Sequence, residues 1–398
     1  MLWRLFDFEI NGASNIIVAF MSRNIIKYIA YFDTQDSEVK RNYVTSASNK
    51  VEYIARRIAS LGHQVEICSM SEVIEDRFRF FPSEEKKLTD DVTLHLFSSF
   101  GGNKSLLRKA KTLWHLLRFF FYLVSHCGKR ESIVVYHSLG YFHTILWAKK
   151  IKKFRLILEV EEIYSDVSQM SNYWRNLEFK MFRTADAFIF SNDLLDAKIN
   201  SKHKPSIVIY GTYQVEPKRV EKFSDGKIHA IYAGTFDHNK GGAQASIMAA
   251  EYLPENYHIH ICGFGTDNDV ADVQRLISEV RTISKATITY DGLKKGEDFI
   301  RFLQQCHIGL STQNPSGEFN DTSFPSKVLT YMANGLQVVS IRIPAIEKSS
   351  VGRCISYYDI QDSENIARAI MSVHIDTNPI VVLQRLDKQF KDELKHLL

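Results

Sequence analysis

The sequence predicts an α/β protein with two doubly wound parallel sheets, and three observations support this. Short β-rich runs alternate with longer helical runs along most of the chain. The 398 residues suit two domains, since one domain usually has about 100–200 residues. A charged, turn-rich segment, Thr212–Gly226, interrupts the pattern near the middle. We therefore expect a Rossmann-like domain over residues 1–211, a second over 227–375 and a C-terminal helix over 376–398.

The first half contains β-rich runs separated by segments with helical spacing. The expected strands are 28–32, 64–68, 92–97, 133–136, 156–160, 187–190 and 207–210. The expected helices are 49–61, 104–124 and 172–182. Because parallel strands need crossover connections, this alternation favours a parallel sheet covered on both faces.

The second half has the more regular rhythm. The expected strands are 228–233, 258–262, 286–290, 308–311, 338–341 and 354–357. The expected helices are 243–252, 270–280, 297–306, a short one that begins at Pro325, and 364–373. A last helix, 381–398, carries Leu383, Leu386, Phe390, Leu394 and Leu397 on one face. That apolar stripe predicts a helix that docks back onto a core.

Bulk composition excludes several classes of protein. A net charge of only +4, spread along the chain, does not suggest nucleic-acid binding. The five cysteines lie far apart with no C-x-x-C pair, so we expect a reducing compartment, no disulfide framework and no metal site. Asp7 and Glu9 interrupt the apolar core that a secretion signal needs, so we expect no such signal at the N-terminus. The longest apolar-rich stretch, Leu113–Val124, is too short to span a bilayer. A cytoplasmic protein is therefore expected.

Three loops after strands of the second half carry glycine, lysine or both. They are Gly234–Gly242 with Lys240, Gly263–Gly265, and the run Thr322–Ser340 with Lys327 at the start of a helix. Glycines let the backbone approach a phosphate, and helix N-termini attract anions. Each loop alone is also compatible with an ordinary turn and a solvated lysine. Because parallel strands end at one sheet edge, the three together predict a diphosphate site.

The order of these motifs resembles the GT-B glycosyltransferases, most closely the family 4-like retaining enzymes that use nucleotide sugars. The motifs are strand–Gly-x(5)-Lys-Gly, strand–Gly-Phe-Gly, Tyr290-Asp-Gly292, Ile308-Gly-Leu-Ser311 and Ser323-Phe-Pro-Ser-Lys-Val-Leu-Thr-Tyr-Met-Ala-x-Gly335. The resemblance covers most of residues 228–358 and points to the Ser-Phe-Pro-Ser-Lys subset. It implies two Rossmann-like domains facing a central cleft, with the acceptor bound by the first and the donor by the second.

The resemblance also implies site residues. The donor-binding positions are Thr235, Lys240, Gly263, Gly265, Leu293, Thr322, Ser323, Lys327 and Thr330. His137 matches a histidine over the donor sugar, although a strand-end histidine bonded to backbone is the alternative. Thr235 stands where an arginine is common, and Thr322 and Thr330 stand where two glutamates are common. Glu318 or Asp321 could substitute for the first glutamate.

Two further features concern the acceptor and the membrane. Glu161 and Glu162 follow a strand and could hold acceptor hydroxyls, or belong to a solvated loop. In helix 104–124, one face carries Lys104, Arg108, Lys111, His115, Arg118 and Tyr122, and the other Leu107, Ala110, Trp114, Leu117 and Phe121. This pattern indicates either a basic amphipathic helix at a membrane surface or a core helix with a solvated basic stripe.

The leading interpretation is a retaining glycosyltransferase of the hexosyltransferase type. It would move a sugar from a nucleotide diphosphate sugar to a glycan or lipid-linked acceptor in surface polysaccharide biosynthesis. It would be cytoplasmic, or peripheral on the inner face of the membrane through helix 104–124, and would need no cofactor or metal. The alternatives are a non-catalytic GT-B subunit that partners another transferase and a nucleotide-sugar epimerase.

Overall fold

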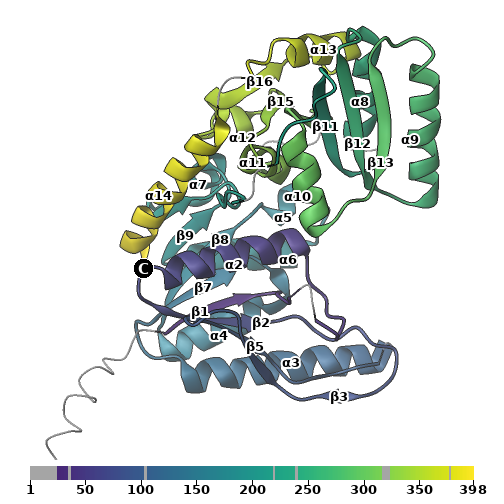
Figure 1. The fold of residues 1–398 in the computed structure, drawn as a ribbon. Helices are drawn as coiled ribbons and strands as arrows, with labels where there is room; N and C mark the ends of the chain where they lie inside the picture. Colours follow the sequence, from purple (N-terminus) through teal and green to yellow (C-terminus); the bar gives the residue numbers. More distant parts are fainter. Residues whose placement is uncertain are drawn as a thin grey trace, which may run out of the picture. The chain divides into compact units, whose positions relative to one another are not determined.

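Two sheets of mostly parallel strands dominate the fold, as the sequence predicts (Figure 1). The structure is a computed structural model that describes residues 25–34, 37–102, 105–217, 220–237, 241–315, 323–375 and 378–398. The chain divides into two compact units, 1–158 with 184–186 and 398, and 159–183 with 187–397.

The first sheet has eight strands in the order β10-β9-β8-β7-β1-β2-β5-β4. Their bounds are β1 Ile25–Ala30, β2 Gln64–Ser69, β4 Glu84–Lys87, β5 Val92–Leu96, β7 Ser132–Tyr136, β8 Arg155–Val160, β9 Ala187–Phe190 and β10 Ser206–Val208. All seven strands expected in this half are confirmed, with ends shifted by a few residues. The unexpected β4 pairs antiparallel with β5. β3 (Phe80–Phe81) and β6 (Ser99–Phe100) form a separate antiparallel pair.

The helices of this half are more numerous than the sequence predicts. They are α2 Thr45–Ala59, α3 Ser105–His126, α4 Phe142–Lys152, α5 Tyr164–Val167, α6 Asn172–Thr184 and α7 Asp193–Ile199, with a 3₁₀ turn η1 at Leu139–Tyr141. The periodicity did not reveal α4, α5 and α7. α7 has only 7 residues, and so short a helix depends on its cap and on packing. Asn192 supplies that cap, since its side chain accepts from the backbone N–H groups of Leu194 and Leu195.

Helix α3 corrects the expected assignment of faces. Lys111 and His115, expected on a solvated basic stripe, are buried at 4% and 1% exposure. Lys111 Nζ donates to the carbonyl oxygen of Val73 at 2.9 Å and lies 3.8 Å from a Glu72 carboxylate oxygen. These contacts supply the partner that a buried ammonium needs. The exposed basic face that both interpretations of α3 assume is therefore wrong at Lys111 and His115.

The second sheet has six strands in the order β13-β12-β11-β14-β15-β16. Their bounds are β11 Ile228–Thr235, β12 Tyr257–Phe264, β13 Thr287–Gly292, β14 Ile308–Ser311, β15 Gln337–Ile341 and β16 Ile355–Tyr358. Every pair is parallel. The six strands expected here are all confirmed.

All the helices expected in this half are present, and α12 (Pro344–Glu347) is an unexpected addition. They are α8 Gly242–Ala249, α9 Asp267–Val280, α10 Gly296–Gln305, α11 Ser326–Ala333, α12 Pro344–Glu347, α13 Ser363–Met371 and α14 Pro379–Leu397, with 3₁₀ turns η2 Ala250–Tyr252 and η4 Gly352–Cys354. α8 packs against α9 and α13, and α11 packs on β14 and β15. Pro325, expected as the first residue of α11, occupies the N-cap position just before the helix.

The last helix docks as predicted. α14 buries Leu383, Leu386, Phe390, Leu394 and Leu397, the stripe that the sequence predicts, and packs on α11 and β10. Over the described part of the chain, no helix has both the length and the apolar character needed to cross a bilayer. All five cysteines are free thiols.

Candidate functional site

The six-stranded sheet reverses its direction of winding between β11 and β14. β12 and β13 lie on one side of this pair, and β15 and β16 lie on the other. In doubly wound sheets, the crevice outside the carboxyl ends of the strands at such a switch point is the usual ligand site. Because β11 and β14 are parallel neighbours, their carboxyl ends lie side by side at this position.

Lys327 reaches from α11 to the end of β11. Its Nζ lies 4.1 Å from the centre of the Tyr232 ring. A Cβ built on Gly234 would lie 3.2 Å from the same Nζ. Pro325 precedes α11 and contributes no side-chain cap. The lysine charge and the positive end of the α11 dipole therefore lie at the same end of the helix, where an anion is favoured.

Tyr331 fixes the position of α11 against the sheet. It is fully buried, and its hydroxyl accepts the Ala233 N–H at 2.9 Å. Its ring occupies the space over Gly309, where a Cβ would fall 2.2 Å from Tyr331 Cγ. Lys327 lies four residues earlier, on the same face of the helix. Gly309 of β14 therefore leaves room for the Tyr331 ring, which holds α11, and with it Lys327, against the sheet.

Tyr232 lies beside Lys327 and also contacts the residues that follow β11. Its hydroxyl donates to the carbonyl oxygen of Thr235 at 3.0 Å. Its ring lies so close to Gly242 that a Cβ there would be 2.7 Å from Tyr232 Cε2. Burial, with a smaller effect of Asp237, raises the pKa of Tyr232 to about 12. The sequence motifs do not include Tyr232; its signal in the sequence is an aromatic residue two positions before Gly234.

The Gly263–Gly265 segment, expected as a loop, is mostly the last part of β12 and lies beside the end of β11. Gly263 pairs with Gly234 in the register of β11 and β12, and a Cβ at Gly263 would lie 1.9 Å from the Gly234 carbonyl oxygen. A Cβ at Gly265 would lie 2.6 Å from Asp269 Cβ. Only glycine fits at these two positions without a rearrangement.

Carboxylates already occupy the N-terminus of α9, the helix that follows Gly265. Thr266 and Asp269 form a reciprocal capping box at the N-terminus of α9. Asp267 adds another carboxylate in the first turn. Two carboxylates repel a phosphate, so this loop suits hydroxyl and base groups, and the Lys327 side suits the diphosphate.

A depression of about 590 Å³ opens at the ends of β11 and β12. It is lined by Thr235, Phe236, Asp237, Phe264, Gly265, Thr266 and Asp269. Its volume is within the range of about 300–1,000 Å³ that small-molecule sites occupy. Leu293 follows β13 directly and is 48% exposed.

The remaining donor candidates divide into described and undescribed residues. Ser323 is half-buried before α11. The Thr330 hydroxyl donates to the Ser326 carbonyl oxygen at 3.2 Å, within its own helix. Lys240, Glu318 and Thr322 lie outside the described residues.

The first-half candidates follow adjacent strands of the eight-stranded sheet. His137 comes directly after β7, is completely buried, and has its ring 5.2 Å from that of Phe142. Glu161 and Glu162 come after β8 and are half-buried. The carbonyl oxygen of Glu161 accepts the Ser191 hydroxyl at 2.6 Å. The nearby buried Glu178, which the sequence analysis did not single out, accepts the N–H groups of Tyr164 and Ser165.

Comparison with known proteins gives structural matches only. No family model and no curated protein sequence matches the chain. Sucrose-phosphate synthase from Thermosynechococcus elongatus matches with a TM-score of 0.61 at 14% identity, over 94% of this chain and 95% of that one. Anabaena HepE in complex with UDP matches with a TM-score of 0.57 at 12% identity, over 93% and 96%.

A third match carries a sugar phosphate. It is a UDP-forming α,α-trehalose-phosphate synthase from Burkholderia xenovorans in complex with glucose-6-phosphate, with a TM-score of 0.56 at 9% identity over 94% and 96%. Identities this low show the fold and not the activity. The chain therefore has the GT-B fold with two Rossmann-like domains, as the sequence predicts.

Proposed function

We propose that this protein is a glycosyltransferase that moves a sugar from a nucleotide diphosphate sugar to a glycan or lipid-linked acceptor. The observation that carries the proposal is Lys327, held beside Gly234 at the switch point of the six-stranded sheet. The names of two structural neighbours, a UDP-forming synthase and a UDP complex, support a nucleotide sugar as the donor. Surface polysaccharide biosynthesis and a cytoplasmic location complete the proposal.

The proposed mechanism depends on electrostatic stabilisation of the leaving diphosphate. As the bond to the sugar breaks, negative charge grows on the diphosphate. The ammonium of Lys327 and the N-terminus of α11 would stabilise that charge, and no metal ion would be required. Lys240 would add a second cation from the first loop. Gly263, Gly265 and Leu293 would contact the nucleoside, and Thr235, Thr322, Ser323 and Thr330 would line the donor site.

The resemblance assigns the remaining roles in this proposal. His137 would face the donor sugar and Glu318 its hydroxyls, while Glu161 and Glu162 would hold the acceptor. We retain the proposed domains, 1–211 for the acceptor, 227–375 for the donor and 376–398 for the closing helix. Hexosyl transfer with retention of configuration is the expected stereochemical outcome.

We further propose that α3 makes a peripheral membrane contact. Leu113, Trp114, Leu117 and Phe121 are 41–63% exposed on this helix. Three cations, Arg108, Lys109 and Arg118, are exposed on the same helix. Exposed aromatic and leucine side chains bordered by cations are typical of helices that lie in a membrane interface. Such a contact would bring the enzyme to a lipid-linked acceptor.

Calorimetric titration with a panel of nucleoside diphosphates tests the donor site. We expect one of them to bind, and Lys327→Ala to weaken it by roughly tenfold or more, because a charge-assisted contact contributes about 1.5–3 kcal/mol. Lys348→Ala is the control, since Lys348 is exposed beyond α12. Failure of every nucleotide to bind, or unchanged affinity in Lys327→Ala, would reject the assignment.

A non-catalytic GT-B subunit is the second candidate, and Thr330 favours it. Its hydroxyl bonds within α11, and threonine cannot supply the two oxygens with which a carboxylate holds a ribose. Turnover decides between the two: an enzyme hydrolyses or transfers the sugar of the matching nucleotide sugar, whereas a subunit binds the nucleotide without turnover.

A further inference from the structure

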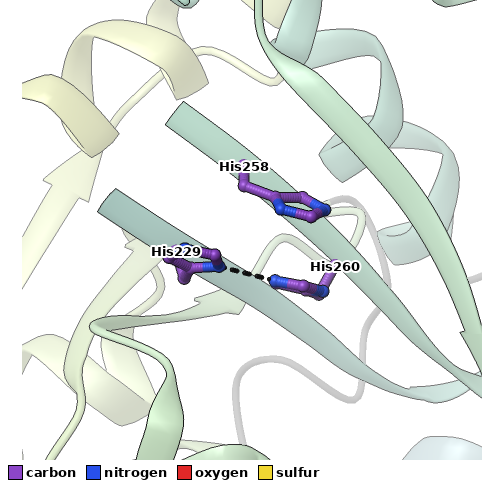
Figure 2. A group of neighbouring side chains, drawn as sticks. All are labelled: His229, His258 and His260. Atoms are coloured by element: carbon purple, nitrogen blue, oxygen red, sulfur yellow. Dashed lines mark hydrogen bonds between the residues drawn. The ribbon is translucent and has the colours of Figure 1, made fainter. Parts of the chain in front are cut away.

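Three histidines lie near the amino ends of β11 and β12. The glycines of the candidate donor site lie at the opposite, carboxyl ends of these strands. His229 is the second residue of β11, and His258 and His260 are the second and fourth of β12. His229 pairs with His258 in the register, and alternate residues of a strand share a face. The three imidazoles therefore stand together on one face of the sheet (Figure 2).

An oxygen atom lies beside one ring nitrogen of each histidine. His229 Nε2 lies 2.8 Å from Asp225 Oδ1, and His260 Nδ1 lies 3.0 Å from Asp291 Oδ2. His258 Nε2 lies 3.0 Å from the Thr289 hydroxyl oxygen. In metal sites, a ligating histidine usually gives its second ring N–H to such an oxygen, which fixes its tautomer and orientation.

The inner nitrogens of two rings face each other. His229 Nδ1 and His260 Nε2 are 2.8 Å apart, as Figure 2 shows. If both rings donate outward to Asp225 and Asp291, both inner nitrogens present lone pairs. Two lone pairs at this distance repel, and a metal ion bound by both nitrogens would remove that repulsion.

The pair is shielded from water, since His229 and His260 are 2% and 3% exposed. Neutral imidazole is the form that binds metal ions.

We propose that His229, His258 and His260 bind a late first-row divalent metal ion, for which Zn²⁺ is the natural probe. One nitrogen of each histidine lies within 4.8 Å of one from each of the others. Imidazole ligands favour Zn²⁺, Co²⁺ or Ni²⁺ over Mg²⁺ and Ca²⁺, which prefer oxygen. The rings need modest movements: the inner nitrogens of His229 and His260 must separate to about 3.4 Å for tetrahedral coordination at about 2.0–2.1 Å.

His258 needs the largest adjustment. Its ring is stacked on that of His260, with centroids 3.9 Å apart and planes 23° from parallel. In-plane lone pairs of stacked rings do not meet at one point, so His258 must turn about its side-chain torsions to become a ligand. His258 is half-buried, and among the described residues its ring bonds only the Thr289 hydroxyl, through Nε2. Such a rotation is a common side-chain motion.

The metal would attach the segment before β11 to the sheet. Phe223 stacks on His229 and His260, with centroids 4.3 and 5.4 Å apart. Asp225 of the same segment contacts His229. The proposed ion is therefore structural, and it goes beyond the proposed sugar transfer, which needs no metal at the diphosphate. It differs from the sequence-based expectation of no metal site.

Zinc binding to the full-length, chelator-treated protein tests the proposal. We expect one equivalent of Zn²⁺ by calorimetry, a higher thermal unfolding midpoint with Zn²⁺, and a Co²⁺ complex with the visible spectrum of tetrahedral coordination. His260→Gln should weaken binding by at least a hundredfold. Asp291→Asn should weaken it by roughly 10–100-fold, as loss of an orienting partner does.

Two matched controls separate this site from other binding. His396→Gln removes an exposed histidine of α14. Glu85→Gln alters another potential ligand group, Glu66, Glu85 and His95. Both should bind Zn²⁺ as the unaltered protein does. No zinc uptake by the unaltered protein, unchanged affinity in His260→Gln, or loss of binding in Glu85→Gln would each overturn the proposal.

X-ray absorption on the unaltered zinc-loaded protein covers the case in which His260→Gln does not fold. Imidazole rings produce a distinctive outer-shell scattering pattern. A first shell with two or three imidazole nitrogens supports the site, and a shell of oxygen atoms alone contradicts it.

Discussion

Close contacts between individual residues set the geometry of the candidate donor site. Gly309 leaves room for Tyr331, and Gly263 leaves room for the Gly234 carbonyl oxygen. A methyl group at Gly263 would force the ends of β11 and β12 apart, and overpacking of this kind costs about 1–3 kcal/mol. The glycines that a sequence pattern marks as phosphate-binding thus have an additional and more local role in packing.

His115 makes the stability of the protein depend on pH. Burial, with smaller effects from Arg41 and Lys111, lowers its pKa to about 4. The unfolded chain protonates near its ordinary value of 6.5, so between these values the unfolded state binds more protons. Stability contributed by the neutral ring is complete above pH 6.5 and is lost as pH falls toward 4. We expect a loss of roughly 3 kcal/mol in the free energy of unfolding.

Urea unfolding at a series of pH values, with chelator present throughout, measures this effect. His115→Leu should flatten the dependence by about one proton. His126→Leu, which alters an exposed histidine of the same helix, should leave it unchanged. An equal slope in His115→Leu and the unaltered protein would contradict the expectation.

At the scale of the element, α3 shows how a periodic pattern can be assigned to the wrong faces. The positions of Lys111, His115, Phe119 and Leu123 recur every four residues and face the core. The stripe with Trp114, Leu117 and Phe121 faces outward. Hydropathy alone would place the second stripe inside. The buried face is decided by local partners, such as the Val73 carbonyl oxygen that accepts from Lys111.

Cosedimentation with phosphatidylglycerol-rich vesicles tests the exposed face of α3. The double variant Trp114→Ser, Phe121→Ser should lower vesicle binding by tenfold or more, since each buried aromatic contributes about 1.5–3 kcal/mol. Binding of the unaltered protein should also fall with added salt. Ile360→Ser is the control, because Ile360 is 62% exposed against 63% for Phe121. Equal sedimentation of the double variant and the control would argue against a membrane contact.

At the scale of the whole molecule, α14 supports the element that carries Lys327. It packs on α11 and β10, and its Phe390 is 1% exposed with its ring 6.4 Å from that of Tyr213. Phe390→Ala should lower the free energy of unfolding by roughly 3–5 kcal/mol, the usual cost of a cavity of this size.

The control for this change is the exposed Lys388 on the same helix. Lys388→Ala should change stability by less than about 0.5 kcal/mol. Denaturant unfolding of the three proteins gives the comparison. Equal midpoints and slopes for Phe390→Ala and Lys388→Ala would show that α14 does not stabilise the fold.

The sequence alone determined the architecture of this protein. The alternation of β-rich and helical runs predicted thirteen strands, and all are present in the two mostly parallel sheets, because backbone pairing and burial follow such local patterns. The order of strands and loops also placed Lys327 near Gly234. Short or weakly patterned elements such as α4 and α7 escaped notice because their stability comes from packing rather than periodicity.

Only the tertiary structure decided which side chains meet. Tyr232 lies under Lys327, Tyr331 lies over Gly309, and three histidines from two strands form one cluster. These contacts join residues from different strands and helices, so no spacing within one segment reveals them. The physical reason is that distance in space depends on sheet register and strand order, whereas sequence periodicity reports only which face of one element is buried.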